Sequence, residues 1–131
     1  MDNKTILIIE DDKLNMKLIR SVLQLGRRCR ILEAESAEKG IQLAREHHPD
    51  LILMDIRLPG MNGLEATRFI KDDPELKDIP VVALTAYAQE EDEAEAIDAG
   101  CTAFIPKPIE TRSFRKKIAM LLSVYSPGYF Q

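Results

Sequence analysis

Acidic side chains follow two apolar segments of this chain, and they are the residues best suited to chemistry. Glu10 and Asp11 come directly after the apolar run of residues 5–9, and Asp55 ends the apolar run of residues 51–54. Apolar runs of this length, bounded by polar or turn-forming residues, are typical of buried strands. Ligands bind outside the carboxyl ends of the strands in an open parallel sheet. We therefore expect the three carboxylates to meet at one edge of a sheet.

Carboxylates held this close repel one another, and protonation or a bound cation relieves the repulsion. Oxygen ligands of this kind suit Mg²⁺, with Mn²⁺ able to take its place. Taken alone, Asp11 and Asp12 would as readily cap a following helix, and Asp55 would as readily be a turn residue. Their joint position after adjacent strands favours a metal site.

A hydroxyl and an ammonium group follow two further apolar segments. Thr85 ends the run of residues 81–84, and Lys107 follows residues 102–105. Taken singly, each is an ordinary strand-end side chain. Around a carboxylate with a divalent cation, however, they make a phosphoryl-transfer site, in which Asp55 is the nucleophile that forms an aspartyl phosphate. The cation and Lys107 would offset the phosphoryl charge, and Thr85 would donate a hydrogen bond.

Strand-like and helix-like segments alternate along the chain. Five strands are predicted, at residues 5–9, 30–34, 51–54, 81–84 and 102–105. Five helices are predicted after them, at about residues 14–25, 36–47, 63–73, 89–99 and 109–124. Five such units in a row predict an α/β fold with a doubly wound parallel sheet. The flavodoxin-like (βα)5 strand order 2-1-3-4-5 fits this length, and its ligand-binding switch point lies between the first and third strands.

Apolar residues of two predicted helices recur at helical spacing, which is typical of a helix with one apolar face. In the first helix these residues are Leu14, Leu18, Val22 and Leu25. In the third helix the residues available for an inner face are Leu64, Thr67, Phe69 and Ile70.

The bulk properties are those of one globular domain. The chain has 131 residues, which we divide into a domain at 1–124 and a C-terminal tail at 125–131. Its net charge of −4 argues against nucleic acid as a partner. No apolar stretch approaches the roughly 20 residues of a membrane span. The two cysteines form no metal-binding spacing, which favours a reducing cytoplasm.

The same residues resemble the receiver domain of bacterial two-component response regulators, the CheY-like family. The matching motifs stand in the family's order at residues 6–12, 53–63, 84–86 and 107–108, and together they span nearly the whole chain. Within the family, the chain is most similar to single-domain, DivK-like regulators. It shares with them the Glu-Asp pair at residues 10–11 and the stretch of residues 14–17.

The resemblance implies a set of roles for the acidic residues. Asp55 would accept a phosphoryl group from a kinase phosphohistidine. Mg²⁺ would be held by the carboxylates of Glu10, Asp11 and Asp55, with Glu10 acting directly or through water. The backbone carbonyl of Arg57 would complete the protein's ligands. The peptide bond before Pro108 would be cis, as X-Pro bonds occasionally are.

The resemblance also implies two pairs of residues that act around the phosphoryl group. Thr85 and Phe104 would be the switch pair, although a strand-borne Phe is more often simply part of the core. Arg57 and Tyr87 stand at the positions that tune phosphate lifetime, two residues after Asp55 and Thr85. Since both side chains would shield the phosphoryl group from water, we hypothesise a long-lived phosphoryl state. Loss within seconds in Mg²⁺ would contradict it.

The implied partners are proteins. A sensor histidine kinase or phosphotransfer protein would donate the phosphoryl group, and a downstream protein would bind the surface around the fourth helix, fifth strand and fifth helix. The acidic fourth helix and basic fifth helix would also make a self-complementary patch for a two-fold homodimer. No nucleic acid or membrane is expected as a partner.

Three other functions share part of this pattern. A phosphatase of the haloacid dehalogenase kind needs a second Asp two residues after the nucleophile, and Arg57 stands there instead. A phosphorylation-independent binding module would have no need of the intact acidic, Thr85 and Lys107 set. A receiver module cut from a hybrid histidine kinase or larger regulator stays open. We expect a phosphoacceptor that catalyses at most its own phosphorylation and dephosphorylation, not an enzyme with a separate substrate.

Overall fold

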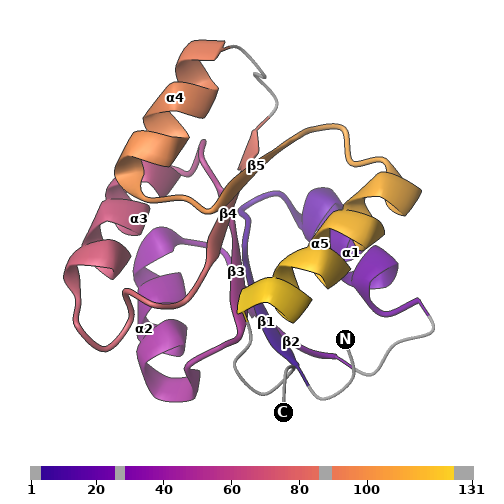
Figure 1. Cartoon of the computed structure of the whole chain (residues 1–131), viewed down its shortest axis with the longest axis horizontal. Helices are drawn as coiled ribbons and strands as arrows, with labels where there is room; N and C mark the ends of the chain where they lie inside the picture. The colour runs from indigo at the N-terminus through magenta and orange to yellow at the C-terminus, as the bar shows by residue number, and fades with distance from the viewer. Residues whose placement is uncertain (1–3, 26–28, 86–89, 126–131) are drawn as a thin grey trace.

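The computed structural model describes residues 4–25, 29–85 and 90–125, with the side chains at 90–92 and 124–125 outside that description. Strands and helices alternate throughout (Figure 1). The strands are β1 (Thr5–Ile9), β2 (Arg30–Ala34), β3 (Leu51–Asp55), β4 (Val81–Thr85) and β5 (Ala103–Pro106). The helices are α1 (Lys13–Leu23), α2 (Ala37–His47), α3 (Gly63–Asp72), α4 (Glu90–Ala99) and α5 (Thr111–Tyr125).

The strands form one parallel sheet in the order β2-β1-β3-β4-β5, which confirms the predicted flavodoxin-like topology. The chain crosses over from β2, on one side of β1, to β3 on the other side, so the strand order reverses between β1 and β3. That reversal makes the carboxyl ends of these two strands the expected place for a ligand.

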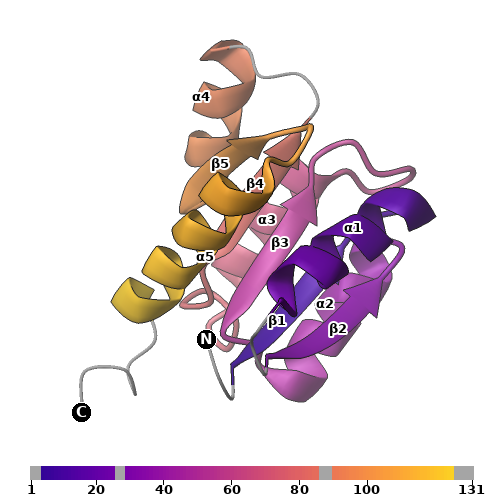
Figure 2. The ribbon, with the colours of Figure 1, turned by 90° about the vertical axis from the view of Figure 1, so that its right-hand side faces the viewer.

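Helices cover both faces of the sheet (Figures 1 and 2). Helices α1 and α5 pack on one face, and α2, α3 and α4 pack on the other. Successive strand side chains point to opposite faces, so each strand contributes to two separate cores. In β1, for example, Ile6 and Ile8 belong to the core under α1 and α5, whereas Leu7 and Ile9 belong to the core under the other three helices.

The buried face of α1 differs from the predicted one. Met16, Ile19, Val22 and Leu23 are buried against the sheet. Leu14 is 79% exposed and Leu18 is 43% exposed, so the stripe expected from these residues is mostly on the outside. The helix carries two apolar stripes at helical spacing, and periodicity alone cannot say which one faces the sheet.

Phe69 of α3 is also more exposed than predicted. It is 44% exposed, and the guanidinium of Arg45 lies over its ring at 5.2 Å from the centroid. Thr67 and Ile70 are buried as expected. Phe69 therefore contributes to a surface contact between α2 and α3 instead of the core.

The last helix ends at Tyr125, one residue into the segment expected to be a tail, and residues 126–131 lie outside the described residues. Within the described ranges, no helix is long and apolar enough to cross a membrane.

Candidate phosphoacceptor and metal site

The backbone hydrogen bonds of the sheet continue past the strand ends and fix the residues of the site. The N–H of Glu10 donates to the carbonyl of Ala34 at 3.0 Å, which extends the pairing of β1 with β2 by one residue. The N–H of Lys107 donates to the carbonyl of Thr85 at 2.6 Å. These bonds tie the backbone of the residues after β1 and β5 to the neighbouring strands.

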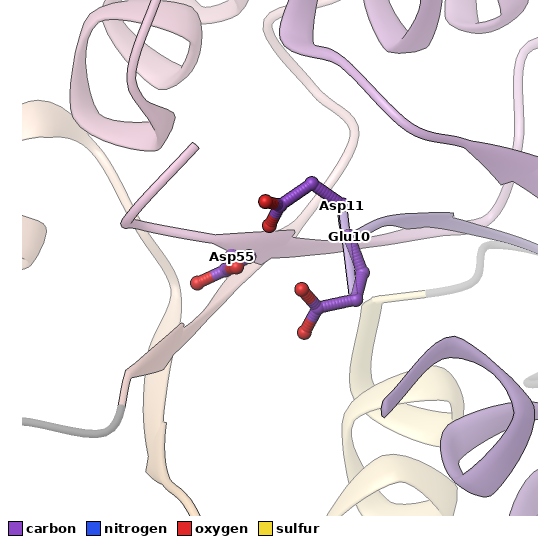
Figure 3. Close-up of side chains that lie close together, drawn as sticks. All are labelled: Glu10, Asp11 and Asp55. Atoms are coloured by element: carbon purple, nitrogen blue, oxygen red, sulfur yellow. The ribbon is translucent and has the colours of Figure 1, made fainter. Parts of the chain in front are cut away.

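Three carboxylates converge at this edge of the sheet (Figure 3). Glu10 and Asp11 follow β1, and Asp55 ends β3; one oxygen from each lies within 4.8 Å of the others. Glu10 and Asp55 are buried, at 1% and 4% exposure, whereas Asp11 is exposed. The cluster thus has a buried floor and one side open to solvent, which suits a cation that keeps some of its waters.

Lys107 lies against the buried part of this cluster. Its ammonium donates a hydrogen bond to Oε1 of Glu10 at 2.6 Å and lies 3.5 Å from Oδ1 of Asp55. Strand alternation explains the meeting: by the period of two, Glu10 after β1, Asp55 at the end of β3 and Lys107 after β5 fall on the α1 and α5 side of the sheet. The ammonium offsets only part of the negative charge of three carboxylates.

The ionisation of Glu10 reflects this crowding. Burial of the carboxyl group and its hydrogen bond with Asp55 raise the pKa of Glu10 to about 7, although Lys107 and the N–H of Asp12 act in the opposite direction. Burial lowers the pKa of Lys107, but its contacts with Glu10 and Asp55 outweigh burial and leave that pKa raised. Lys107 therefore stays charged at neutral pH.

Asp11 and Asp12 were each candidates for capping a helix or joining the metal site, and the structure gives them different positions. Oδ1 of Asp12 accepts hydrogen bonds from the N–H groups of Leu14 and Asn15 at 2.8 and 3.1 Å, so Asp12 is the N-cap of α1. Asp11 is the one that reaches the carboxylate cluster. Helix capping thus accounts for Asp12 and leaves Asp11 for the site.

The loop from β3 to α3 holds Asp55 in place through contacts that sequence reasoning missed. The N–H of Arg57 donates to Oδ1 of Asp55 at 3.1 Å, and the N–H of Gly63 donates to the carbonyl of Ile56 at 2.9 Å. Oδ1 of Asn62 accepts from the N–H of Glu65 at 2.9 Å and caps α3. The loop therefore closes tightly on the strand end that carries Asp55. The Pro-Gly and Asn-Gly pairs at 59–60 and 62–63 are the only sequence signal of this loop.

Thr85 and Phe104 lie on a different side of the sheet from the buried acids. Thr85 is 1% exposed and directly follows Leu84, the register partner of Asp55. Strand alternation places Thr85 on the α2, α3 and α4 side, and Phe104 packs against the core of that same side. The two expected switch residues thus share one face of neighbouring strands β4 and β5.

Three further expectations concern the surroundings of the site. The Lys107–Pro108 bond is cis, as expected. Arg57 is exposed, and it lines an open hollow of about 610 Å³ with Asp11, Asn62 and Glu95 among its other walls. Tyr87 lies outside the described residues.

The comparisons with known proteins agree with this arrangement. The sequence profile of the response regulator receiver domain matches residues 6–119. The polar-differentiation response regulator DivK of Brucella ovis is 46% identical over 119 residues, covering 91% of this chain and 96% of that protein.

Two solved structures share the fold. The magnesium-bound receiver domain of a sensor histidine kinase from Pseudomonas aeruginosa is 30% identical, with a TM-score of 0.76, and the match covers 93% of this chain and 96% of that one. The manganese-bound response regulator Rcp1 is 26% identical, with a TM-score of 0.76 and 95% of each chain covered. In the first, the magnesium ion is coordinated in the active-site cleft.

Proposed function

The chain belongs to the response regulator receiver family, and we propose that it is a single-domain signalling switch in which Asp55 accepts the phosphoryl group. The proposed receiver domain comprises residues 1–124, with residues 125–131 as a tail. One observation carries the proposal: the carboxylates of Glu10, Asp11 and Asp55 and the ammonium of Lys107 converge at the reversal point of the sheet.

The donor set fits a divalent cation. Three carboxylate oxygens within 4.8 Å of one another are hard ligands of the kind that Mg²⁺ and Mn²⁺ prefer. We propose that Glu10, Asp11, Asp55 and the backbone carbonyl of Arg57 hold the ion. A bound ion would supply positive charge to offset that of the phosphoryl oxygens.

The transfer itself needs little more than positioning. A carboxylate oxygen of Asp55 attacks the phosphorus of a phosphohistidine, the P–N bond breaks, and the imidazole leaves with a proton from solvent. The N–H of Arg57 holds Oδ1 of Asp55 and so orients the attacking carboxylate. Lys107 lies close enough to offset the new negative charge.

The remaining residues would report and prolong the phosphorylated state. We propose that the hydroxyl of Thr85 hydrogen-bonds a phosphoryl oxygen and that Phe104, on the same face of the sheet, turns inward in response. Arg57, which lines the open hollow beside Asp11, would shield the phosphoryl group from water, together with Tyr87. The chain would then be a phosphoacceptor with self-catalysed turnover, not an enzyme with a separate substrate.

The phosphodonor would be a histidine kinase or phosphotransfer protein of the cytoplasm. Leu14 and Leu18 lie one helical turn apart, are 79% and 43% exposed, and stand on the helix that begins beside the acidic cluster. We propose that a helix of the donor protein docks on them.

Exchange of Leu14 and Leu18 for Asn is expected to slow phosphoryl transfer from a phosphohistidine protein and to leave phosphorylation by a small phosphodonor unchanged. Met120→Asn, at a similarly exposed apolar residue of α5, should change the rate of phosphorylation by neither donor.

The downstream partner would bind the surface of α4, β5 and α5, and the same surface would support a two-fold homodimer. Helix α5 exposes Arg112 and Lys116, and α4 exposes Glu93 and Glu95. Opposite charges on adjacent elements favour a self-complementary contact. A chain that stays monomeric at high concentration, with and without a phosphate mimic, would exclude the homodimer.

A receiver module from a larger protein is the second candidate function, since one structural relative is the receiver domain of a sensor kinase.

Phosphorylation by a small phosphodonor tests the proposed function. We expect the intact mass of the native chain to rise by one phosphoryl group in the presence of Mg²⁺ and to stay unchanged when EDTA removes the metal. After the donor is removed, the added mass should persist for longer than seconds, as shielding by Arg57 requires. A chain that gains no phosphoryl mass in Mg²⁺, or gains as much in EDTA, contradicts the proposal.

A further inference from the structure

A lysine of α5 holds the backbone of the strand that carries Phe104. Nζ of Lys117 donates a hydrogen bond to the carbonyl oxygen of Phe104 in β5, at 3.2 Å. Lys117 belongs to α5, which packs on one face of the sheet, whereas the ring of Phe104 packs against the core on the opposite face. One hydrogen bond thus connects α5 with the backbone of a residue whose side chain lies across the sheet.

The strand β5 has less support than the central strands. It lies at the edge of the sheet and pairs with β4 alone. Its last residue is Pro106, the register partner of Thr85, and proline has no N–H to donate. The carbonyl of Thr85 accepts from the N–H of Lys107 instead. An edge strand with few bonds of its own moves more easily than a central one, so the bond from Lys117 matters to where β5 lies.

The bond from Lys117 can also be given up. Among the described residues, Lys117 forms no ion pair, and the carbonyl of Phe104 is its only hydrogen-bond acceptor. The half-buried side chain lines a hollow of about 260 Å³ between β5 and α5, with Ile105, Pro106 and Phe114 among its other walls. The hollow is open to solvent, so the ammonium can exchange the carbonyl for water when β5 moves.

We propose that Lys117 is a positioning residue that holds β5 in its resting place and so limits how often Phe104 turns inward. The inference rests on the proposed role of Phe104 as a switch residue. The ring of Phe104 is half-buried against the core beneath α2, α3 and α4. A ring that moves deeper into that core draws its backbone the same way, which is away from α5. The inward turn therefore stretches or breaks the bond from Lys117.

Loss of this bond should make the inward state more common in the chain that carries no phosphoryl group. Removal of a modest hydrogen bond changes a two-state ratio about fivefold. Lys117→Met keeps a long side chain and removes the ammonium, so we expect the ratio of inward to resting Phe104 to rise by about that factor. Lys117→Arg retains a charged donor and should stay close to the native ratio.

The ring of Phe104 reports this ratio directly. The four phenylalanines are observed by NMR in selectively labelled protein, and the Phe104 signal is assigned by its loss in Phe104→Leu. The native chain, alone and saturated with Mg²⁺ and the phosphoryl mimic beryllofluoride, gives the two reference positions. Without the mimic, the Lys117→Met signal should lie closer to the saturated position than the native signal does. A Lys117→Met signal at the native resting position would overturn the proposal.

A gain in affinity for the mimic separates restraint from general damage to β5. Because beryllofluoride would bind the inward state, an inward fraction about five times larger should tighten its apparent affinity about fivefold. A substitution that only loosened the strand would weaken binding. Lys116→Met, at the exposed neighbouring lysine, removes the same charge and should change neither the ring signal nor the affinity. Unchanged or weaker affinity in Lys117→Met would count against the restraint.

Failure of this restraint is distinct from failure of the proposed function, which is read from phosphoryl mass on Asp55. A chain that takes up the phosphoryl group, with ring signal and mimic affinity unaltered by Lys117→Met, would defeat the restraint alone. A chain that takes up no phosphoryl group, and whose Phe104 signal does not respond to the mimic, would defeat both.

Discussion

Asp55→Asn is expected to abolish phosphoryl incorporation from a small phosphodonor in Mg²⁺. The Asn amide has nearly the same shape as the carboxylate, and its oxygen can still accept the hydrogen bond from the Arg57 N–H. Its oxygen and nitrogen are, however, poor nucleophiles at neutral pH, so no stable acyl phosphate can form. Intact mass spectrometry under conditions that fully phosphorylate the native chain should show no added phosphoryl group.

The matched control lies at the opposite end of the same strand. Asp50 directly precedes β3, and its Oδ2 accepts a hydrogen bond from the N–H of Thr5 at 2.8 Å. Asp50→Asn keeps an oxygen acceptor there and should be phosphorylated like the native chain. Thermal unfolding should show that Asp55→Asn is no less stable than the native chain, because loss of one carboxylate relieves repulsion in the cluster. Equal phosphoryl uptake by Asp55→Asn would place the phosphoacceptor elsewhere.

Gly63→Ala is expected to disturb the site through the backbone. A Cβ atom at residue 63 would overlap the carbonyl oxygen of Asp55 and lie 2.8 Å from the Cα of Ile56. Both are backbone atoms of the strand end, so neither can move aside without displacing Asp55. Overpacking of this kind costs about 1–3 kcal/mol of stability. A misplacement of about 1 Å can also slow a reaction about 10²-fold. We expect a lower unfolding midpoint together with much slower phosphorylation.

Gly60→Ala separates the two effects of the Gly63 change. Gly60 belongs to the same loop and has a φ of 74°, and a Cβ there would meet only Oε2 of Glu38, at 3.8 Å. The left-handed conformation costs a non-glycine residue about 1–2 kcal/mol, so stability should fall without a clash against Asp55. Phosphorylation of Gly60→Ala should therefore stay close to native. Similar slowing in both variants would mean that loss of stability alone explains the effect.

The strand ends were predictable because parallel strands impose their own geometry. The apolar runs before Glu10, Asp55 and Thr85 end within one residue of the observed strands. Since all carboxyl ends of a parallel sheet open at one edge, the meeting of Glu10, Asp11 and Asp55 followed from topology alone.

Other features depend on three-dimensional packing that a linear pattern does not hold. Helix α1 has two apolar stripes, and the one containing Met16 and Ile19 faces the sheet while Leu14 does not. The short contact between Lys107 and Glu10 joins residues 97 positions apart and depends on side-chain length as well as strand phase. The tight fit of Gly63 against the backbone of Asp55 likewise appears only in three dimensions.

The sheet divides the molecule into two chemical compartments. Glu10 and Lys107 project toward the core beneath α1 and α5, whereas Phe104 packs into the core beneath α2, α3 and α4. Thr85 lies on the same side as Phe104, so it is the residue of the proposed phosphoryl site that borders the second core. Substitutions in the second core can therefore alter how the phosphorylated state is sensed through Thr85 and Phe104, while the carboxylates and Lys107 on the first side stay unchanged.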